Sequence, residues 1–288
     1  DINWARQDGW WNFATQGVSP VGDTYYPWAV RAVDVDGDLD IDAVVSEYSG
    51  NKVQWYESSG GDTPTWTQHY VGAAQNPMDL ATADFDGDGH LDIVSGNAGA
   101  SRVSVFMSDG DDTFTTYTLT TPSSPWGVAV ADLDADSDLD IIFATSASSN
   151  SVCWIENLGS RSFASYACMS GSTEAYGVTA ADMDGDDDMD VVSGEVAWYE
   201  NDGAASFTRH SIYSNPAWKK GIHVRTGDVD MDGDLDVVAV DMGAFTIGSY
   251  GTFSCDVLTE YRESIGLGYQ WQGDCTGQMY WFENTCPP

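Results

Sequence analysis

The chain has 288 residues, of which 42% are hydrophobic and 12% aromatic, and it carries 46 acidic against 10 basic residues, a formal net charge of −36. That apolar and aromatic content predicts a folded protein rather than an acidic disordered tail. The charge excludes nucleic acid and anionic membrane surfaces as partners, because so few basic side chains cannot neutralise a phosphate track. No apolar run approaches the roughly 18–20 residues that span a bilayer, so we expect no membrane insertion.

The first predicted element is GWWNFATQ, residues 9–16. Its aromatic residues favour a β-strand at about 9–17. Three partner strands that would precede it in a sheet are missing, so we expect an isolated outer strand.

Five aspartate-rich segments follow at spacings of 50, 48, 50 and 46 residues. They are DVDGDLDID from Asp34, DFDGDGHLD from Asp84, DLDADSDLD from Asp132, DMDGDDDMD from Asp182 and DVDMDGDLD from Asp228. Each has Asp at positions 1, 3, 5 and 9. A period of this length indicates stacked supersecondary units.

Three carboxylates within five residues repel one another unless a hard cation binds them. Calcium takes six to eight oxygen ligands, so the segments predict up to five Ca²⁺ ions, one per loop. A solvated acidic turn would explain the charge but not the regular recurrence. An EF-hand is excluded, because no segment has the required Glu at position 12.

The same short strands surround every segment. Apolar strands precede and follow it, then come a third strand and, after a Gly-containing turn, a fourth. The first strands are WAVRAV, MDLATA, WGVAVA, YGVTAA and IHVRTG, and the third strands are VQWYE, VSVFM, VCWIE, VAWYE and MYWFE. Four strands in about 48 residues are typical of a propeller blade.

The two ends of the chain complement each other. The last strand, MYWFEN (279–284), lacks a fourth strand, and residues 9–17 would supply it. The sequence therefore predicts one all-β domain, 1–288. It is a five-bladed β-propeller of four-stranded blades, with the ring closed by the N-terminal outer strand pairing with the C-terminal blade.

The repeats resemble the FG-GAP/VCBS family over nearly the whole chain. Its calcium-loop propellers include integrin heads, fungal and bacterial lectins and some polysaccharide lyases. The resemblance implies the fold and calcium, whereas function varies widely among such folds.

The family pattern assigns calcium ligands to Asp34, Asp36, Asp38 and Asp42 and to the equivalent residues of the other loops. With position 7 of the later loops included, those equivalents are Asp84, Asp86, Asp88, His90, Asp92, Asp132, Asp134, Asp136, Asp138, Asp140, Asp182, Asp184, Asp186, Asp188, Asp190, Asp228, Asp230, Asp232, Asp234 and Asp236. His90 falls where a backbone carbonyl would bind, so we expect its imidazole to be exposed.

In such blades the aspartate loop joins the first strand to the second, which leaves the opposite face for a ligand. The last repeat is elaborated on that face by a basic loop before its first strand and by an insertion at 241–278. Long loops in compact repeats are more often functional than accidental. The candidate ligand-binding residues are Trp28, Trp126, Trp218, Lys219, Lys220, His223, Arg225, Tyr250, Tyr261 and Trp271.

Two alternatives stay open for these residues. Arg31 and Arg225, with Asp79 and His223, either point toward a central channel or neutralise nearby loop aspartates. Trp28, Trp126 and Tyr176 at the strand starts either cap the centre or stack on sugar rings.

The chain has five cysteines, which favours an oxidising, extracellular or cell-surface location. Cys153 and Cys168 flank a turn symmetrically and predict a disulfide. Cys255 and Cys275 would staple the insertion, leaving Cys286 unpaired or joined to a partner chain. A start at Asp without Met favours a processed mature chain.

Three functions remain open. The favoured one is a secreted, calcium-binding, lectin- or adhesion-like module whose partner is a glycan or an extracellular or cell-surface protein. The second is a polysaccharide lyase or other carbohydrate-active enzyme, with His223, Arg225 and Tyr261 as the acid–base and carboxylate-binding groups. The third is a structural subunit of an extracellular layer or filament that self-assembles. No paired-carboxylate or nucleophile motif occurs outside the loops, so we lean against catalysis.

Overall fold

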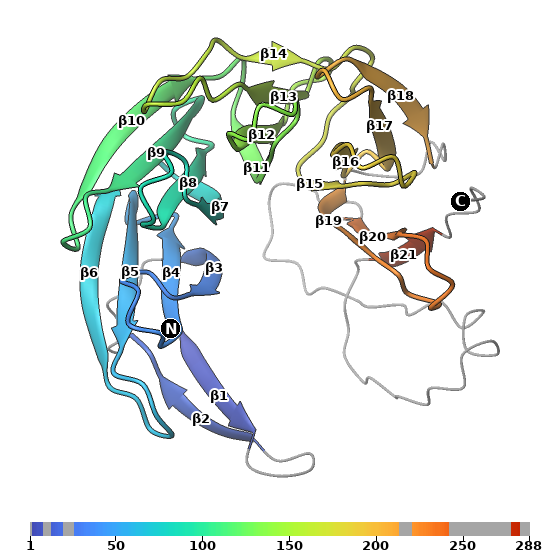
Figure 1. Ribbon diagram of the computed structural model, residues 1–288. Helices are drawn as coiled ribbons and strands as arrows, with labels where there is room; N and C mark the ends of the chain where they lie inside the picture. The colour runs from blue at the N-terminus through green and yellow to red at the C-terminus, as the bar shows by residue number, and fades with distance from the viewer. Residues whose placement is uncertain (1, 8–12, 20–25, 213–220, 242–277, 283–288) are drawn as a thin grey trace.

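The computed structural model describes residues 2–7, 13–19, 26–212, 221–241 and 278–282. Within these ranges the chain is all-β, and five antiparallel sheets follow one another in an arc (Figure 1). Each sheet is built around one of the aspartate segments, and we call the sheets blades one to five. No helix in the described ranges is long and apolar enough to cross a membrane.

The strand bounds agree with the four-strand pattern of the sequence. Blade one contains β3 (Pro27–Val33), β4 (Asp42–Glu47), β5 (Lys52–Ser58) and β6 (Trp66–Ala73). Blade two contains β7 (Pro77–Ala83), β8 (Asp92–Asn97), β9 (Arg102–Ser108) and β10 (Phe114–Thr120). Blade three contains β11 (Pro125–Ala131), β12 (Asp140–Thr145), β13 (Val152–Ile155) and β14 (Ala167–Cys168).

The last two blades follow the same order. Blade four contains β15 (Val178–Ala181), β16 (Asp190–Ser193), β17 (Ala197–Asn201) and β18 (Phe207–Ser211). Blade five has three described strands, β19 (Gly221–Gly227), β20 (Asp236–Asp241) and β21 (Gln278–Phe282). The first strands of successive blades (β3, β7, β11, β15 and β19) contact one another in order and line the inside of the arc (Figure 1). We call them the inner strands.

The position of each strand in its blade explains its composition. The second strands β4, β8 and β12 are buried throughout, which is why their sequences read as near-continuous apolar runs. The outer strand β10 instead alternates half-buried and exposed residues, and its threonines face water. Burial by the two neighbouring blades therefore sets the pattern.

Hydrophobic clusters hold the blades together face to face. Trp55 of blade one packs with Leu80 and Phe106 of blade two, and all three are fully buried. Similar clusters join blades two and three, three and four, and four and five. Each fully buried large side chain contributes about 1.5–3 kcal/mol. Apolar burial between sheets is therefore the main interaction that joins successive blades.

The predicted ring closure by the N-terminal strand is not seen in the described residues. Phe13–Gly17 is strand β2, and in the described residues it pairs antiparallel with β1 (Asn3–Gln7) instead of β21. Val18, Ile2 and Trp4 of this region pack with Ala43, Val45 and Tyr56 of blade one. The β1–β2 hairpin lies beside that blade (Figure 1). A hairpin between neighbouring segments needs little loop-closure entropy, which favours this local pairing. Residues 8–12 lie outside the described ranges, and the ring closure stays a prediction.

Blade three contains the expected disulfide. Cys153 on β13 and Cys168 on β14 are directly opposite in the register and are bonded. Strand β14 has two residues, so the covalent bond replaces much of the ladder that the other outer strands form. Cys255, Cys275 and Cys286 lie outside the described residues.

Replacing both Cys153 and Cys168 by alanine is expected to lower the free energy of unfolding. The bond closes a segment with a sequence separation of 15, and crosslinks of that span contribute about 3 kcal/mol. Urea unfolding of the variant, beside the wild type with and without reductant, measures the effect. An identical midpoint in all three samples would contradict it.

Candidate metal centres

The five aspartate loops share one backbone shape. In each, the carboxylate at position 1 accepts a hydrogen bond of 2.9–3.2 Å from the backbone N–H at position 6. Position 6 has a positive φ in every loop: Leu39 (75°), Gly89 (88°), Ser137 (76°), Asp187 (74°) and Gly233 (104°). This conformation costs a residue with a side chain roughly 1–2 kcal/mol. Three loops therefore keep the turn without glycine, held by the same carboxylate.

Each loop gathers a group of three carboxylates whose oxygen atoms lie within 4.8 Å of one another. Every group contains positions 1 and 3, together with position 9 in loops one, two and four or position 5 in loops three and five. The groups are Asp34, Asp36 and Asp42; Asp84, Asp86 and Asp92; Asp132, Asp134 and Asp136; Asp182, Asp184 and Asp190; and Asp228, Asp230 and Asp232. The other predicted ligands at positions 5 and 9, outside these groups, are Asp38, Asp88, Asp140, Asp186 and Asp236.

Unpaired oxygen atoms in loops three and four indicate that a metal ion fits. Oδ1 of Asp132, Asp134 and Asp184 is buried and accepts no hydrogen bond. A buried acceptor without a partner costs about 1–3 kcal/mol, and more when it is charged. Burial and repulsion by neighbouring carboxylates also raise the pKa of Asp134, Asp184 and the equivalent Asp36. A cation bound between these oxygens would remove both penalties.

The aspartate at position 9 of each loop also has a structural role. Asp140 accepts hydrogen bonds from the backbone N–H of Leu133, at position 2 of its loop, and of Asn157, just beyond the third strand, at 3.1 and 2.9 Å. The same two bonds occur in blades one, two and four, at 2.7–2.9 Å. A buried carboxylate therefore links the start of the aspartate loop to the third strand of the same blade.

Burial makes these carboxylates weak acids. Loss of hydration raises the pKa of Asp42, Asp92 and Asp190 to about 6 and that of Asp140 to about 7, although their backbone hydrogen bonds oppose the shift. Nearby loop carboxylates add to the increase.

The predicted residues at position 7 lie against a glycine rather than in the carboxylate groups. A Cβ on Gly110 would meet the ring of His90, and the turn glycines of blades three and four approach Asp138 and Asp188 in the same way. These turn glycines have positive φ. Position 7 therefore packs on the turn between the third and fourth strands, and for the equivalent Asp234 the described residues give no such contact.

Aromatic side chains gather at the other end of the blades, where the inner strands begin. The rings of Trp28 and Trp126 lie 6.5 Å apart, and Trp126 meets Tyr176 edge-on at 4.6 Å. Tyr48 joins them 5.7 Å from Trp28. Trp28 stays 54% exposed. We call this the aromatic end; the rings cover one another as the capping alternative expects, and Trp28 also keeps an open surface.

Arg31 forms its ion pair with Asp79, which is not one of the loop aspartates. Its guanidinium is 2.6 Å from the carboxylate of Asp79 on the next inner strand, and that carboxylate also accepts the backbone N–H of Val128 at 3.2 Å. Burial and the charges of Arg225 and Arg31 lower the pKa of His223, while Asp79 raises it. Arg31 thus pairs with an aspartate of the next inner strand rather than with a loop aspartate, and the orientation of these side chains toward a channel stays a prediction.

The remaining candidates fall outside the described residues. They are Trp218, Lys219, Lys220, Tyr250, Tyr261 and Trp271. Their part in a ligand site stays a prediction.

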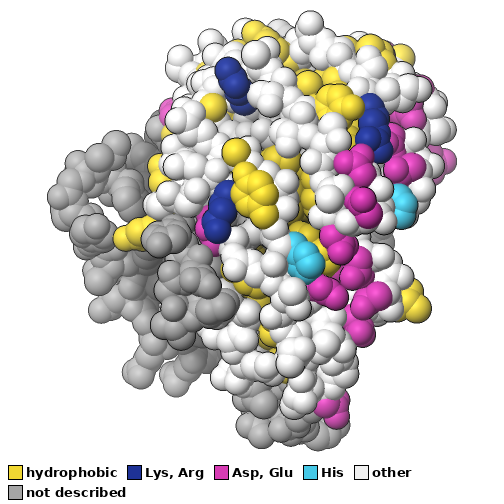
Figure 2. Space-filling model, turned by 90° about the vertical axis from the view of Figure 1, so that its left-hand side faces the viewer, with side chains coloured by type: hydrophobic (Ala, Val, Ile, Leu, Met, Phe, Trp, Pro, Cys, Tyr) yellow, Lys and Arg dark blue, Asp and Glu magenta, His cyan; other side chains and the backbone are white. Residues whose placement is uncertain are grey.

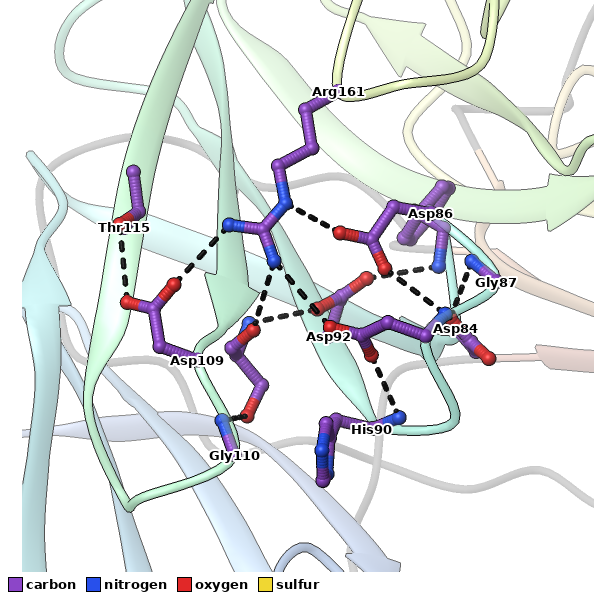
Figure 3. Close-up of polar contacts among 12 residues, drawn as sticks. Asp84, Asp86, Gly87, His90, Asp92, Asp109, Gly110, Thr115 and Arg161 are labelled. Carbon is purple, nitrogen blue, oxygen red and sulfur yellow. Dashed lines mark hydrogen bonds and ion pairs between the residues drawn. The ribbon is translucent and has the colours of Figure 1, made fainter.

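Sequence reasoning missed two kinds of contact between blades, one made by asparagine and one by arginine. Nδ2 of Asn157 donates to the carbonyl of Phe85 in loop two, and Nδ2 of Asn201 donates to the carbonyl of Leu133 in loop three, each at 2.8 Å. Arg161, in the same turn as Asn157, reaches the carboxylates of loop two (Figure 3). Aligning NLGSRSF with NDGAASF in the two turns would have revealed the repeated Asn and the single Arg.

The acidic groups are concentrated in space as well as in sequence. Because the inner strands run side by side, all their aspartate loops lie at the same end of the blades. Figure 2 shows acidic side chains in a band along one side of the visible surface, on the right of the view.

The FG-GAP-like repeat model matches residues 35–95, 84–143 and 133–193. These matches together cover more than half of the sequence, and the chain belongs to the FG-GAP-like repeat family. The family resemblance of the aspartate loops is thereby confirmed. No curated protein matches the sequence.

Solved structures resemble the fold. Three of them are the V. cholerae biofilm matrix protein Bap1 (18% identity, TM-score 0.48, 75% of this chain and 35% of that one), a catalytically inactive virginiamycin B lyase from Staphylococcus aureus with quinupristin (12%, 0.51, 79% and 67%), and BBS1N in complex with ARL6DN (10%, 0.47, 78% and 66%). The chain spans about a third of the length of Bap1. At 12% identity, the lyase shows similarity of fold alone.

Without calcium, the melting temperature is expected to fall as the pH rises from 5 to 8. The buried carboxyls keep their protons to pH about 6 or 7, whereas unfolded aspartates lose theirs near pH 4. Between these values the folded state binds more protons, so stability decreases with pH. A fall of several degrees is expected, since 1 kcal/mol corresponds to about 2–4 °C.

Melting curves in calcium-free buffer across this range test the prediction. The same series in saturating calcium is the control, because an ion bound to the charged carboxylates reduces the fall. A melting temperature that rises steadily in calcium-free buffer would contradict it.

Proposed function

We propose that this chain is an extracellular calcium-binding propeller domain. In this proposal it binds a glycan, or an extracellular or cell-surface protein, in the manner of a lectin or adhesion module. The observation that carries the calcium part is the carboxylate group of each loop, with its unpaired buried oxygens in loops three and four. The aromatic residues at the aromatic end, opposite those loops, support the ligand-binding part of the proposal.

Calcium suits the loops better than other common ions. Every candidate side chain in the groups is a carboxylate, so the donors are hard oxygens. Calcium accepts irregular sets of six to eight oxygens, whereas magnesium requires a near-octahedral set and keeps more water. When bound, the ion supplies positive charge that lets neighbouring carboxylates stay ionised and close together.

Calcium is expected to raise the melting temperature of the full chain. Each site bound only in the folded state adds about 2.7 kcal/mol when calcium is at one hundred times its dissociation constant. Differential scanning calorimetry of chelator-treated protein, with calcium or magnesium added back, measures the increase.

Asp134→Asn is expected to remove one site from a calcium titration, because the residue is central to the group of loop three. Asp62→Asn, outside the carboxylate groups, is the matched control. A melting temperature that changes with neither calcium nor chelator would reject the calcium part of the proposal.

The aromatic end has the chemistry of a sugar-binding surface. An indole face stacks on the apolar face of a sugar ring, and Trp28 has one that is partly exposed. Arg225 and Arg31, the latter paired with Asp79, add positive charge to the inner strands of a strongly acidic protein. That combination favours an acidic glycan with uronate or sulfate groups.

Trp28→Ala is expected to weaken retention on a uronate-rich polysaccharide roughly five- to tenfold, since an aromatic contact contributes about 1 kcal/mol or more. The matched control is Tyr70→Ala. Tyr70 is 62% exposed on the outer strand β6 of the same blade. Affinity electrophoresis in calcium, with a neutral glucan for comparison, measures both variants.

Light scattering of the eluted polymer separates the alternatives. Equal retention of wild type and both variants would reject the aromatic end as the binding surface. A polymer that shortens would favour a lyase and direct attention to His223 and Arg225. No binding, with growth of the protein into large particles, would favour a structural subunit.

A further inference from the structure

An arginine from the next blade reaches loop two, whereas loop three has no such contact in the described part of the chain. Arg161 lies in the turn between β13 and β14 of blade three. Its Nε donates to Asp86 at position 3 of loop two, and one terminal nitrogen lies 3.4 Å from Asp88 at position 5. The other terminal nitrogen is 3.1 Å from Asp109, in the turn after β9 (Figure 3).

The guanidinium is held in place by more than these ion pairs. It also donates to the backbone carbonyl of Ser108 at 3.2 Å. The backbone of Arg161 has a φ of 61°, in the left-handed region that residues with a side chain rarely adopt. The carboxylates of Asp86 and Asp109 raise the pKa of Arg161 further above its usual value, so it stays charged. A permanent positive charge therefore sits beside the carboxylate group of loop two.

The equivalent place over loop three lacks the charge. The turn of blade four matches that of blade three: Asn201 repeats the clamp of Asn157, and Ala205, with a φ of 53°, stands where blade three has Arg161. The backbone N–H of Ala205 donates to the carbonyl of Leu133 in loop three, at 3.2 Å. In loop three, Oδ1 of Asp134 is buried and unpaired, whereas the same position in loop two is bound by Arg161.

We propose that Arg161 is a tethered counter-cation that competes with calcium for Asp86 and makes loop two the weakest calcium site. The competition has two parts. One oxygen of Asp86 is committed to Nε of Arg161, and the guanidinium repels a second cation at the same carboxylates. This inference rests on the proposed calcium binding and adds an order among the sites.

In this proposal Arg161 also stabilises the interface between blades two and three when no calcium is bound. Its three ion pairs join blade three to the loop and the turn of blade two, so it holds this interface in the absence of the metal. Loops three and four, where buried carboxylate oxygens have no partner, depend on the metal instead.

The test is calorimetric calcium titration of chelator-treated full-length protein for the wild type, Arg161→Gln and Ala205→Arg. Arg161→Gln is expected to strengthen one site roughly 10- to 100-fold, the effect of removing one charge at ion-pair distance near a protein surface. Ala205→Arg is expected to weaken a different site by about three- to tenfold. The smaller effect follows because Leu158 replaces Asp109 beside loop three.

A second measurement assigns the change to loop two. In the background of Asp84→Asn, which impairs the carboxylate group of that loop, Arg161→Gln is expected to leave the remaining sites unchanged. Arg161→Gln should also lower the melting temperature more in chelator than in saturating calcium.

The outcomes separate this inference from the proposed function. Normal calcium binding with no change of any affinity in Arg161→Gln and Ala205→Arg overturns the inference and leaves calcium binding intact. An equal fall in melting temperature with and without calcium also overturns it and makes Arg161 a plain interblade contact. If the wild type binds no calcium, both proposals fall together.

Discussion

The repulsion among carboxylates crowded at one end of the blades is the constraint on which the rest of this structure depends. Each loop brings three of them within 4.8 Å. Backbone N–H groups hold the carboxylates at positions 1 and 9, and the latter also bind the third strand. The loop and the blade are therefore one mechanical unit, and a cation that stabilises the loop stabilises the sheet behind it.

Adjacent blades are coupled by the same loops. The apolar clusters between sheets supply most of the cohesion. In addition, Asn157 and Asn201 each donate a hydrogen bond to the aspartate loop of the preceding blade. An interaction that stabilises one loop therefore also stabilises the contact of that loop with the next blade. Arg161 occupies one of these junctions, where a fixed cation stands beside the position proposed for a diffusible one.

In the proposed function, the aspartate loops at one end of the blades stabilise the fold and the aromatic end binds the ligand. The aspartate loops are committed to holding the blades, which leaves the aromatic end to vary. There the contacts of Trp28, Trp126 and Tyr176 join blades one, three and four into one surface. Beside it, Arg31 and Asp79 link neighbouring inner strands. Binding chemistry can therefore change at this end without disturbing the proposed metal loops.

The sequence by itself determined the repeat, the strand order, the Cys153–Cys168 bond and the carboxylate groups, because spacing and alternation encode local structure directly. Tertiary structure alone decided what depends on packing between blades: the partner of Arg31, the turn contact of His90, the hairpin pairing of residues 13–17 and the reach of Arg161 into loop two. Arg161 and Asp86 are far apart in the chain, and only the stacking of blades brings them together. No periodicity within one repeat could reveal a contact made between two.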